Sequence, residues 1–325
     1  MRLILRKLLP FLHLTRITTA FAAVGNVWFV VLWTRASGKD LETGTSVIWQ
    51  LDLFWLLLAS AITAVGLFVY GMALNDVLDL QYDRAFAPQR PLPSGQLRLV
   101  WAVSLVVIAL MAAILGSFFL GMQALLMCML TAGAILFFNA AGKFIPAVGL
   151  VSLGLIYAAH MLIPNYQLRF VWPVWVVMTH SLFVGAWTYS LEEKRPLMSK
   201  RGIFAMILGW VVWSGVLIYA GHRRGGIWPR WVDWKIIVGP VVLALLFVWY
   251  GRRKVKKTQS RYRAAEKLKR YGALWLTLYD TAWMLGQGYW HGALLLACLA
   301  LAGFVGMTAV RELLGLLERP LEYRR

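Results

Sequence analysis

The feature of this sequence that most restricts its fold is a succession of apolar runs from one end to the other. Each run has roughly 18 to 22 residues, enough for an α-helix to cross a hydrocarbon layer about 30 Å thick. Inside lipid, every backbone polar group must find its hydrogen-bond partner within the protein, so such runs fold as helices. We therefore expect an all-α, multi-pass integral membrane bundle.

The composition excludes a water-soluble globular protein. Only 14% of the 325 residues are charged, against about 25% in a soluble domain. The net charge of +19 would suggest a nucleic-acid partner in a soluble protein. Here the basic residues occupy short connections between apolar runs, where orientation signals and anionic headgroups explain them. We expect the lipid bilayer as a partner and no nucleic acid.

The apolar runs predict one membrane domain, 1–325, with a basic interfacial lead-in at 1–16, a helical core at 17–287 and an extra C-terminal helix and basic tail at 288–325. A secretory signal is the alternative for the lead-in, but no small-residue cleavage site follows it. The predicted spans are 17–34, 53–74, 99–120, 122–140, 146–164, 171–190, 202–221, 235–250 and 271–287, with a tenth at 290–310.

The basic connections predict the orientation of the bundle. If the spans alternate, the basic links 84–98, 191–202 and 252–270 all lie on one side, which identifies that side as the cytoplasm. The link 221–235, on the other side, is also basic, and its three tryptophans are typical of an interfacial belt.

Three aspartates and an asparagine follow the second apolar run. At 100° per residue they share an arc of about 100° on a continuing helix; the four are Asn75, Asp76, Asp79 and Asp83. Carboxylate and amide oxygens suit Mg²⁺, which also takes phosphate oxygens as ligands. Arg84 and Arg90 come close behind and suit the oxygens of a diphosphate. The alternative is a solvated helix end whose acids pair with these two arginines.

A stiff connector follows the acidic stripe. In "RPLPSG" (90–95) two prolines flank Leu92 and prevent helix formation, and Ser94-Gly95 favours a turn before the next span. This connector is expected to hold Arg90 near the phosphates.

Together these residues resemble a known family. The pattern Asn75-Asp76-x-x-Asp79-x-x-x-Asp83, followed by Arg90-Pro91-Leu92-Pro93-Ser94-Gly95, is similar to the first signature of the UbiA superfamily of intramembrane prenyltransferases. The short spacing from Asp83 to Arg90 resembles the short-loop branch, which includes archaeal ether-lipid enzymes. The likeness extends to about residue 287.

The resemblance implies a bundle of nine helices around a cavity that opens sideways into lipid. It also implies transfer of a prenyl group from a polyprenyl diphosphate to a lipophilic, often aromatic, acceptor with Mg²⁺. The site mouth would lie on the cytoplasmic side. By resemblance, Asn75, Asp76, Asp79 and Asp83 would hold Mg²⁺ and Arg90 would contact the diphosphate. Lys143, in "FFNAAGKFIP", is either a further diphosphate contact or an interfacial lysine that extends its amine to the membrane surface.

The second family signature is reduced in this chain. The family usually carries two or three aspartates between its sixth and seventh spans, whereas "TYSLEEKRPLMSKRG" has only Glu192 and Glu193 as acids. These glutamates could hold a second Mg²⁺ while nearby cations contact phosphate, namely Lys194, Arg195, Lys200 or Arg201. One metal plus cations is the alternative, as is a protein that binds a prenyl diphosphate or lipid without turnover.

Several polar residues lie within or beside apolar spans: Asn26, Asn139, His160, His180 and Asp280. Hydrogen bonds between helices are the common reason for such residues. Asp280 is the candidate for orienting the acceptor or removing its proton, because an acid at mid-span depth is costly.

Two other function classes fit less well. A CDP-alcohol transferase needs a D-G-x-x-A-R run, which this chain lacks. A transporter would place its charged cluster near the membrane midplane, whereas these aspartates stand at the end of a span. The sequence thus favours a Mg²⁺-dependent prenyltransferase, with a catalytically reduced lipid-binding protein as the alternative.

Overall fold

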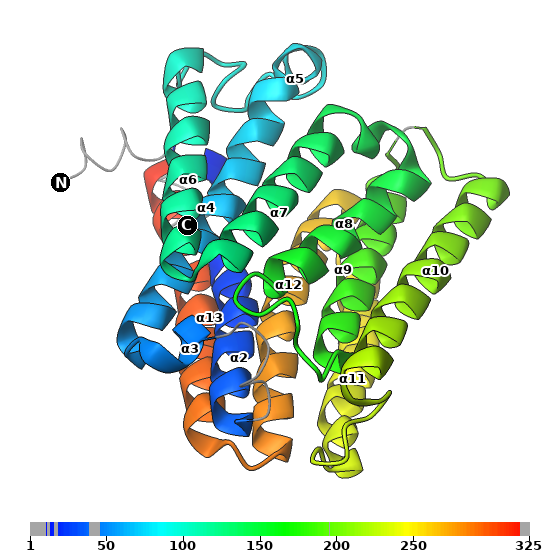
Figure 1. The fold of residues 1–325 in the computed structure, drawn as a ribbon. Helices are drawn as coiled ribbons and strands as arrows, with labels where there is room; N and C mark the ends of the chain where they lie inside the picture. Colours follow the sequence, from blue (N-terminus) through cyan, green and yellow to red (C-terminus); the bar gives the residue numbers. More distant parts are fainter. Residues whose placement is uncertain (1–10, 12–13, 16–18, 39–45, 195, 319–325) are drawn as a thin grey trace.

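A computed structural model describes residues 11, 14–15, 19–38, 46–194 and 196–318, with the side chains of Ser46 and of 311–318 excepted. Most of the predicted lead-in and Arg195 lie outside the described residues. The described chain is helical throughout its regular structure (Figure 1). Its long helices are α2 (Ala20–Ser37), α4 (Leu53–Leu78), α6 (Leu99–Phe119), α7 (Met122–Ala140), α8 (Pro146–Met161), α9 (Trp172–Leu191), α10 (Lys200–Gly225), α11 (Val238–Lys257), α12 (Arg261–Gly286) and α13 (Trp290–Glu318).

Each of these helices corresponds to one predicted span, and α13 confirms the tenth. The short helices α3 (Ser46–Gln50) and α5 (Leu80–Phe86) lie at the two ends of α4. Seven helices of the described chain are long and apolar enough to cross a membrane by length and composition; α8, α9 and α12 are not among them, and α8 is apolar but shorter. The reason in α12 is its first part, 261–270, which is rich in lysine and arginine.

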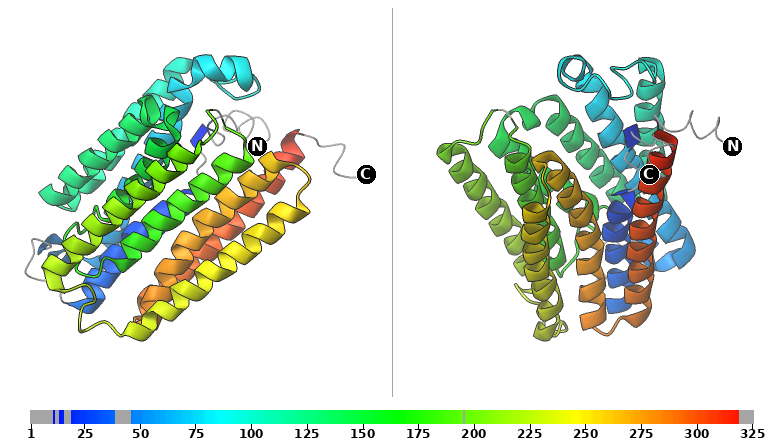
Figure 2. Two further views of the ribbon diagram at one scale, coloured as in Figure 1. Left: turned by 90° about the vertical axis from the view of Figure 1, so that its right-hand side faces the viewer. Right: turned by 180° about the vertical axis from the view of Figure 1, so that it is seen from behind.

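Six helices form the centre of the bundle. Each packs on the next, in the order α2, α4, α7, α8, α9 and α12, and α12 packs back on α2. We call this arrangement the inner ring. Outside it, α6 lies on α4 and α7, α10 lies on α8 and α9, and α11 lies on α12. Helix α13 packs on α12 and α2, and the view from behind shows these three side by side (Figure 2).

The outer helices carry the lipid-facing surface. Along α10 large apolar side chains are exposed, for example Phe204 at 68%, and a bilayer would cover them. Helix α2 has most of its residues buried, as its place in the inner ring requires. Where α4 and α6 pack, an added Cβ at Gly66 would come within 2.7 Å of the Ala109 carbonyl oxygen. Glycine is therefore needed there for close approach.

Aromatic side chains fill one end of the inner ring. The indole of Trp33 stacks on Phe170 at 5.1 Å, and Phe170 meets Trp283 edge-on at 5.3 Å. From the link after α10, Trp228 packs on Phe170 and Trp231 on Trp33. These two tryptophans therefore help to close this end of the bundle, and their place in an interfacial belt stays a prediction. Trp234 is 68% exposed.

Candidate active site at the basic end

The four residues of the acidic stripe lie where α4 meets α5. Asp79 separates the two helices, yet its N–H donates to the carbonyl of Asn75 at 2.9 Å. The N–H of Asp83 in turn donates to the carbonyl of Asp79 at 2.7 Å. Helical bonding therefore continues through the junction, and the stripe stays on one face as its spacing predicts.

Arg90 and Asp83 form the first ion pair of the site. The Nη1 of Arg90 lies 2.7 Å from the Oδ2 of Asp83 and 3.8 Å from the Oδ1 of Asp76. The two carboxylates are almost fully buried, with residue exposures of 4% and 7%. Burial acts to lower the pKa of Arg90, but the hydrogen bond and charge of Asp83, with Asp76, outweigh it and raise the pKa overall.

Lys143 forms the second ion pair. Its ammonium lies 2.6 Å from the Oδ1 of Asp79 and also donates to the Oδ1 of Asn75 at 3.1 Å. Lys143 follows α7, the neighbour of α4 in the inner ring. The cation therefore reaches the acidic stripe from a different helix, and its ammonium is engaged by the stripe rather than only extended toward the membrane surface.

The proline connector holds Arg90 in place. The N–H of Arg90 donates to the Ala87 carbonyl at 3.0 Å, and its own carbonyl accepts from Ser94 at 3.0 Å. The side chains of Leu92 and Leu97 are buried in a small apolar cluster with residues of α4 and α6. This packing anchors the connector beside the end of α4.

The donor set of the stripe fits Mg²⁺ in kind, because it offers carboxylate and amide oxygens only. Among the described residues, no three carboxylate, imidazole or thiol side chains stand close enough together to hold a metal ion. Instead, Arg90 neutralises Asp76 and Asp83 while Lys143 neutralises Asp79. The stripe therefore has the ligands for a metal, and the two cations beside it suit a diphosphate. In this structure the carboxylates of the stripe form ion pairs with these two cations.

The two glutamates of the second motif lie across the inner ring, at the end of α9. Glu192 pairs with Lys269 of α12 and, at 3.1 Å, with Lys194. Burial acts to raise the pKa of Glu192, but the two lysines lower it overall. Glu193 pairs with Arg261, so the glutamates bind different cations and are not brought together.

The remaining predicted cations are scattered. Arg84, Lys200 and Arg201 are exposed, and within the described chain none of them has an ion pair with a carboxylate. Two cations of α12 that bind the second motif, Lys269 and Arg261, were not among the predicted site residues. Both belong to the basic run 252–270, from which only the orientation of the bundle was predicted.

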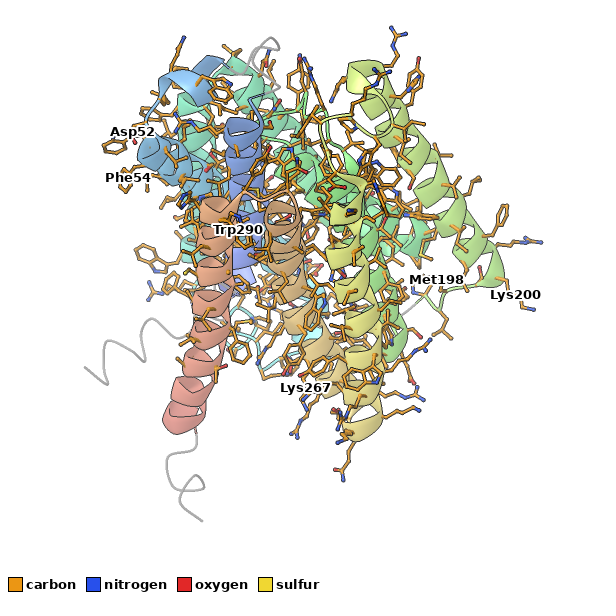
Figure 3. All side chains as sticks on the ribbon, turned by 90° about the horizontal axis from the view of Figure 1, so that it is seen from below. Asp52, Phe54, Met198, Lys200, Lys267 and Trp290 are labelled. Atoms are coloured by element: carbon orange, nitrogen blue, oxygen red, sulfur yellow. The ribbon has the colours of Figure 1, made fainter. Side chains whose placement is uncertain are left out.

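We call the end of the bundle that carries both motifs the basic end. It holds Asp79 and Lys143 on one side of the inner ring and Glu192 and Lys269 on the other. Tyr262, in the first turn of α12, contributes to the raised pKa of Arg90. The start of α12 is therefore close enough to influence the first motif. Figure 3 shows Lys200 and Lys267 in the lower part of its view, away from Asp52 and Trp290.

Asp280 lies deeper in the bundle. It is fully buried, and neither carboxylate oxygen has a hydrogen-bond partner among the described residues. It lies three turns further along α12 than Lys269, which at 1.5 Å per residue is about 16 Å from the basic end. The structure therefore does not bring Asp280 together with the acidic stripe.

The other polar residues of the spans divide into two groups. Asn139 donates to the Gly71 and Ile135 carbonyls, and His180 contacts the Gly272 carbonyl and the Tyr279 hydroxyl. Hydrogen bonds therefore account for these two, as is common between membrane helices. Within the described chain, both amide atoms of Asn26 and the Nε2 of His160 lack a partner, like Asp280.

Known proteins of similar sequence share an enzyme name. No family model matches the chain. The chain is 27% identical over 205 residues to the digeranylgeranylglyceryl phosphate synthase of Sulfurisphaera tokodaii, covering 62% of this chain and 68% of that protein. It is 32% identical over 131 residues to the synthase of the same name from Metallosphaera sedula, covering 40% of this chain and 41% of that one.

A solved structure of a digeranylgeranylglyceryl phosphate synthase in membranes matches with a TM-score of 0.54 and 20% identity, covering 86% of this chain and 98% of that chain. These relatives and the shared fold agree with the resemblance of the first acidic motif to the UbiA superfamily of intramembrane prenyltransferases. A UbiA homologue from Aeropyrum pernix also aligns, with a TM-score of 0.45 and 16% identity over 89% of this chain and 97% of that one.

The described part of the chain has nine long helices from α2 to α12, the number that the family resemblance implies, and α13 is additional to them. The first acidic motif and its connector keep the family pattern in sequence and lie together at the basic end. The second motif departs from the pattern, because cations of α12 bind its two glutamates. The similarity to membrane prenyltransferases therefore lies in the fold, in the sequences of the relatives and in the first motif.

Proposed function

We propose that this protein is a UbiA-type enzyme that transfers a prenyl group from an allylic polyprenyl diphosphate to a lipophilic acceptor within the membrane, with Mg²⁺. The observation that supports this best is the convergence of the acidic stripe with Arg90 and Lys143 at one end of the inner ring. A diphosphate needs both cations for its oxygens and carboxylates for a bridging metal.

Asn75, Asp76, Asp79 and Asp83 are the residues that would hold Mg²⁺. Two of the carboxylates are buried and near one another, an arrangement that costs free energy unless cations compensate for it. In the absence of substrate, Arg90 and Lys143 supply that compensation. When bound, Mg²⁺ would supply a positive charge that stabilises the departing diphosphate.

The side chains of this protein would perform the remaining steps. Arg90 and Lys143 would bind the outer oxygens of the diphosphate and stabilise its growing negative charge. The bond from the prenyl C1 to the diphosphate oxygen breaks, and both electrons leave with the diphosphate. The acceptor forms the new bond to C1 and loses a proton. Apolar walls would keep water from the allylic cation until that bond forms.

The acceptor is lipophilic because it must reach a site inside a lipid-embedded bundle. An aromatic acceptor is what the family pattern favours, and the names of both synthases point to a glycerol-phosphate lipid as the other class. The mouth of the site would face the cytoplasm, because the basic links gather at this end. Asp280 would orient the acceptor; its depth argues against removal of the proton from the acceptor atom that bonds to C1.

The decisive experiment measures diphosphate release from geranylgeranyl or farnesyl diphosphate by purified full-length protein in lipid vesicles, with and without Mg²⁺. Asp76→Asn, Asp79→Asn and Asp83→Asn should each reduce the rate by at least about a hundredfold, the scale of losing one electrostatic group of a catalytic site. Asp52→Asn is the matched control, because Asp52 is an acid at the opposite end of α4 whose capping role asparagine can keep.

Wild-type rates in the three stripe variants would refute the proposal. Binding of prenyl diphosphate by the wild-type chain without any diphosphate release, across aromatic and glycerol-phosphate acceptors, would identify the catalytically reduced binding protein instead. The pairing of Glu192 and Glu193 with α12 is the observation that favours this second function.

A further inference from the structure

The additional helix α13 creates a niche on the outer side of the bundle. Three residues of α12 line it, Lys267, Arg270 and Tyr271, and three residues of α13 complete it, Phe304, Met307 and Thr308. The niche lies outside the inner ring, because α13 packs on the outer side of α12. It is therefore separate from the candidate active site.

The position of the niche along α12 places it at the level of lipid headgroups. The helix changes from a basic stretch, 261–270, to an apolar one, 271–286. Lys267 and Arg270 are among the last cations before this change, and Tyr271 is the first residue beyond it. A lysine or arginine at such a boundary stands where headgroup phosphates lie. Figure 3 shows Lys267 near α13 at this end of the bundle.

The charges of α12 differ between its two faces. On the face toward α9, Lys269 and Arg261 are neutralised by Glu192 and Glu193. On the niche side, neither Lys267 nor Arg270 has a carboxylate within ion-pairing distance among the described residues. The Lys267 ammonium lies 3.3 Å from the Thr258 hydroxyl, which is neutral. Two uncompensated cations side by side favour an anionic partner.

The floor of the niche is apolar and aromatic. Phe304 is 44% exposed, and Met307 is buried beneath. The Tyr271 ring packs edge-on against Tyr250 at 5.0 Å, with the Lys254 ammonium 5.9 Å from its centroid. A ligand that fits must therefore present an anionic head to the cations and hydrocarbon to Phe304.

We propose that this niche binds the phosphate headgroup of an anionic phospholipid from the leaflet at the basic end. Lys267 and Arg270 would bind the phosphate, and an acyl chain would lie along Phe304. The bound lipid would hold α13 against α12. The proposal does not depend on prenyl transfer.

The test compares the full-length protein with two double variants in detergent. Lys267→Ala/Arg270→Ala removes the two cations of the niche. Lys256→Ala/Lys257→Ala is the matched control, because it removes two exposed lysines of the same basic run that do not line the niche. Each protein is titrated with phosphatidylglycerol, with phosphatidylcholine and with inorganic phosphate, and native mass spectrometry counts the bound molecules while thermal unfolding is followed.

Wild type and control should bind one phosphatidylglycerol about tenfold more tightly than the niche variant does, and this lipid should raise their melting temperature. Equal binding of phosphatidylglycerol by the niche variant and the wild type would overturn the proposal. An equal loss of binding in the control variant would also overturn it, because it would show that the basic run attracts anionic lipid without a specific site. A melting shift produced equally by inorganic phosphate would also overturn it, because a free anion would then be the ligand.

Discussion

Lys143 and Asp79 join the ends of two helices that are neighbours in the inner ring, with 2.6 Å between ammonium and carboxylate. Their side chains are only 16% and 20% exposed, so solvent screens the pair less than it would at a surface. A second contact from the same ammonium to Asn75 places one cation over two members of the acidic stripe. If the stripe binds Mg²⁺ and a diphosphate as proposed, the Lys143 ammonium would leave Asp79 and contact the diphosphate.

The first prediction concerns this lysine. Lys143→Met should raise the KM for prenyl diphosphate by about 10- to 100-fold, the value of one charge-assisted hydrogen bond. It should also lower the Mg²⁺ concentration for half-maximal activity, because Asp79 no longer shares its charge with an ammonium. Steady-state kinetics at varied Mg²⁺ measures both.

Lys235→Met provides the control for Lys143, because Lys235 is an exposed lysine beyond the far end of the bundle. Its kinetic constants should match those of the wild type. An unchanged KM in Lys143→Met would show that the lysine only neutralises Asp79.

The second prediction follows from the environment of Glu192, at the end of α9. Because Lys269 and Lys194 lower its pKa below 4.5 in the folded protein, ionised Glu192 stabilises the fold. That stabilisation is fully present above about pH 4.5 and is lost as the pH falls through the lowered value. Glu192→Gln should therefore reduce the free energy of unfolding at pH 7 by about 1–3 kcal/mol.

Thermal unfolding of Glu192→Gln and wild type between pH 7 and pH 3 measures this effect. The difference in melting temperature should shrink as the pH falls below 4.5. Glu266→Gln, at an exposed acid of α12 with no ion pair to a described residue, should show little difference at any pH. A Glu192 difference that stays constant with pH would contradict the electrostatic explanation.

The fold was predictable from the sequence because the length of an apolar run fixes where a helix crosses lipid. Each predicted span became one helix, including α13. The stripe from Asn75 to Asp83 was also predictable, because residues of one short segment keep their helical spacing.

The pairing of charges was not predictable in the same way. Lys143 reaches Asp79 from another helix, and Lys269 reaches Glu192 across the gap between α9 and α12. Such contacts depend on which helices become neighbours, and spacing within one segment does not contain that information. The two tryptophans of the link after α10 show the same limit, since the sequence does not contain the information that they pack against Phe170 and Trp33.

The last prediction separates the two roles that the sequence suggested for Asp280. About 16 Å of helix separates Asp280 from Lys269 and the basic end. Removal of a proton from the acceptor atom that bonds to the prenyl C1 requires direct contact or one bridging water, and this depth does not provide either. A contact with a more distant polar group of the acceptor is compatible with the depth, and it would give the two bare carboxylate oxygens a partner.

Asp280→Asn should therefore leave diphosphate release in the absence of acceptor within about twofold of the wild type. The KM for the acceptor should rise by about tenfold, because an amide replaces the carboxyl group in the proposed hydrogen bond. Separate measurement of diphosphate release and of prenylated product distinguishes the two effects. If both stay at wild-type values in Asp280→Asn and in Asp280→Leu, Asp280 has no part in acceptor binding. If release alone falls, the residue acts on the prenyl diphosphate and the depth argument fails.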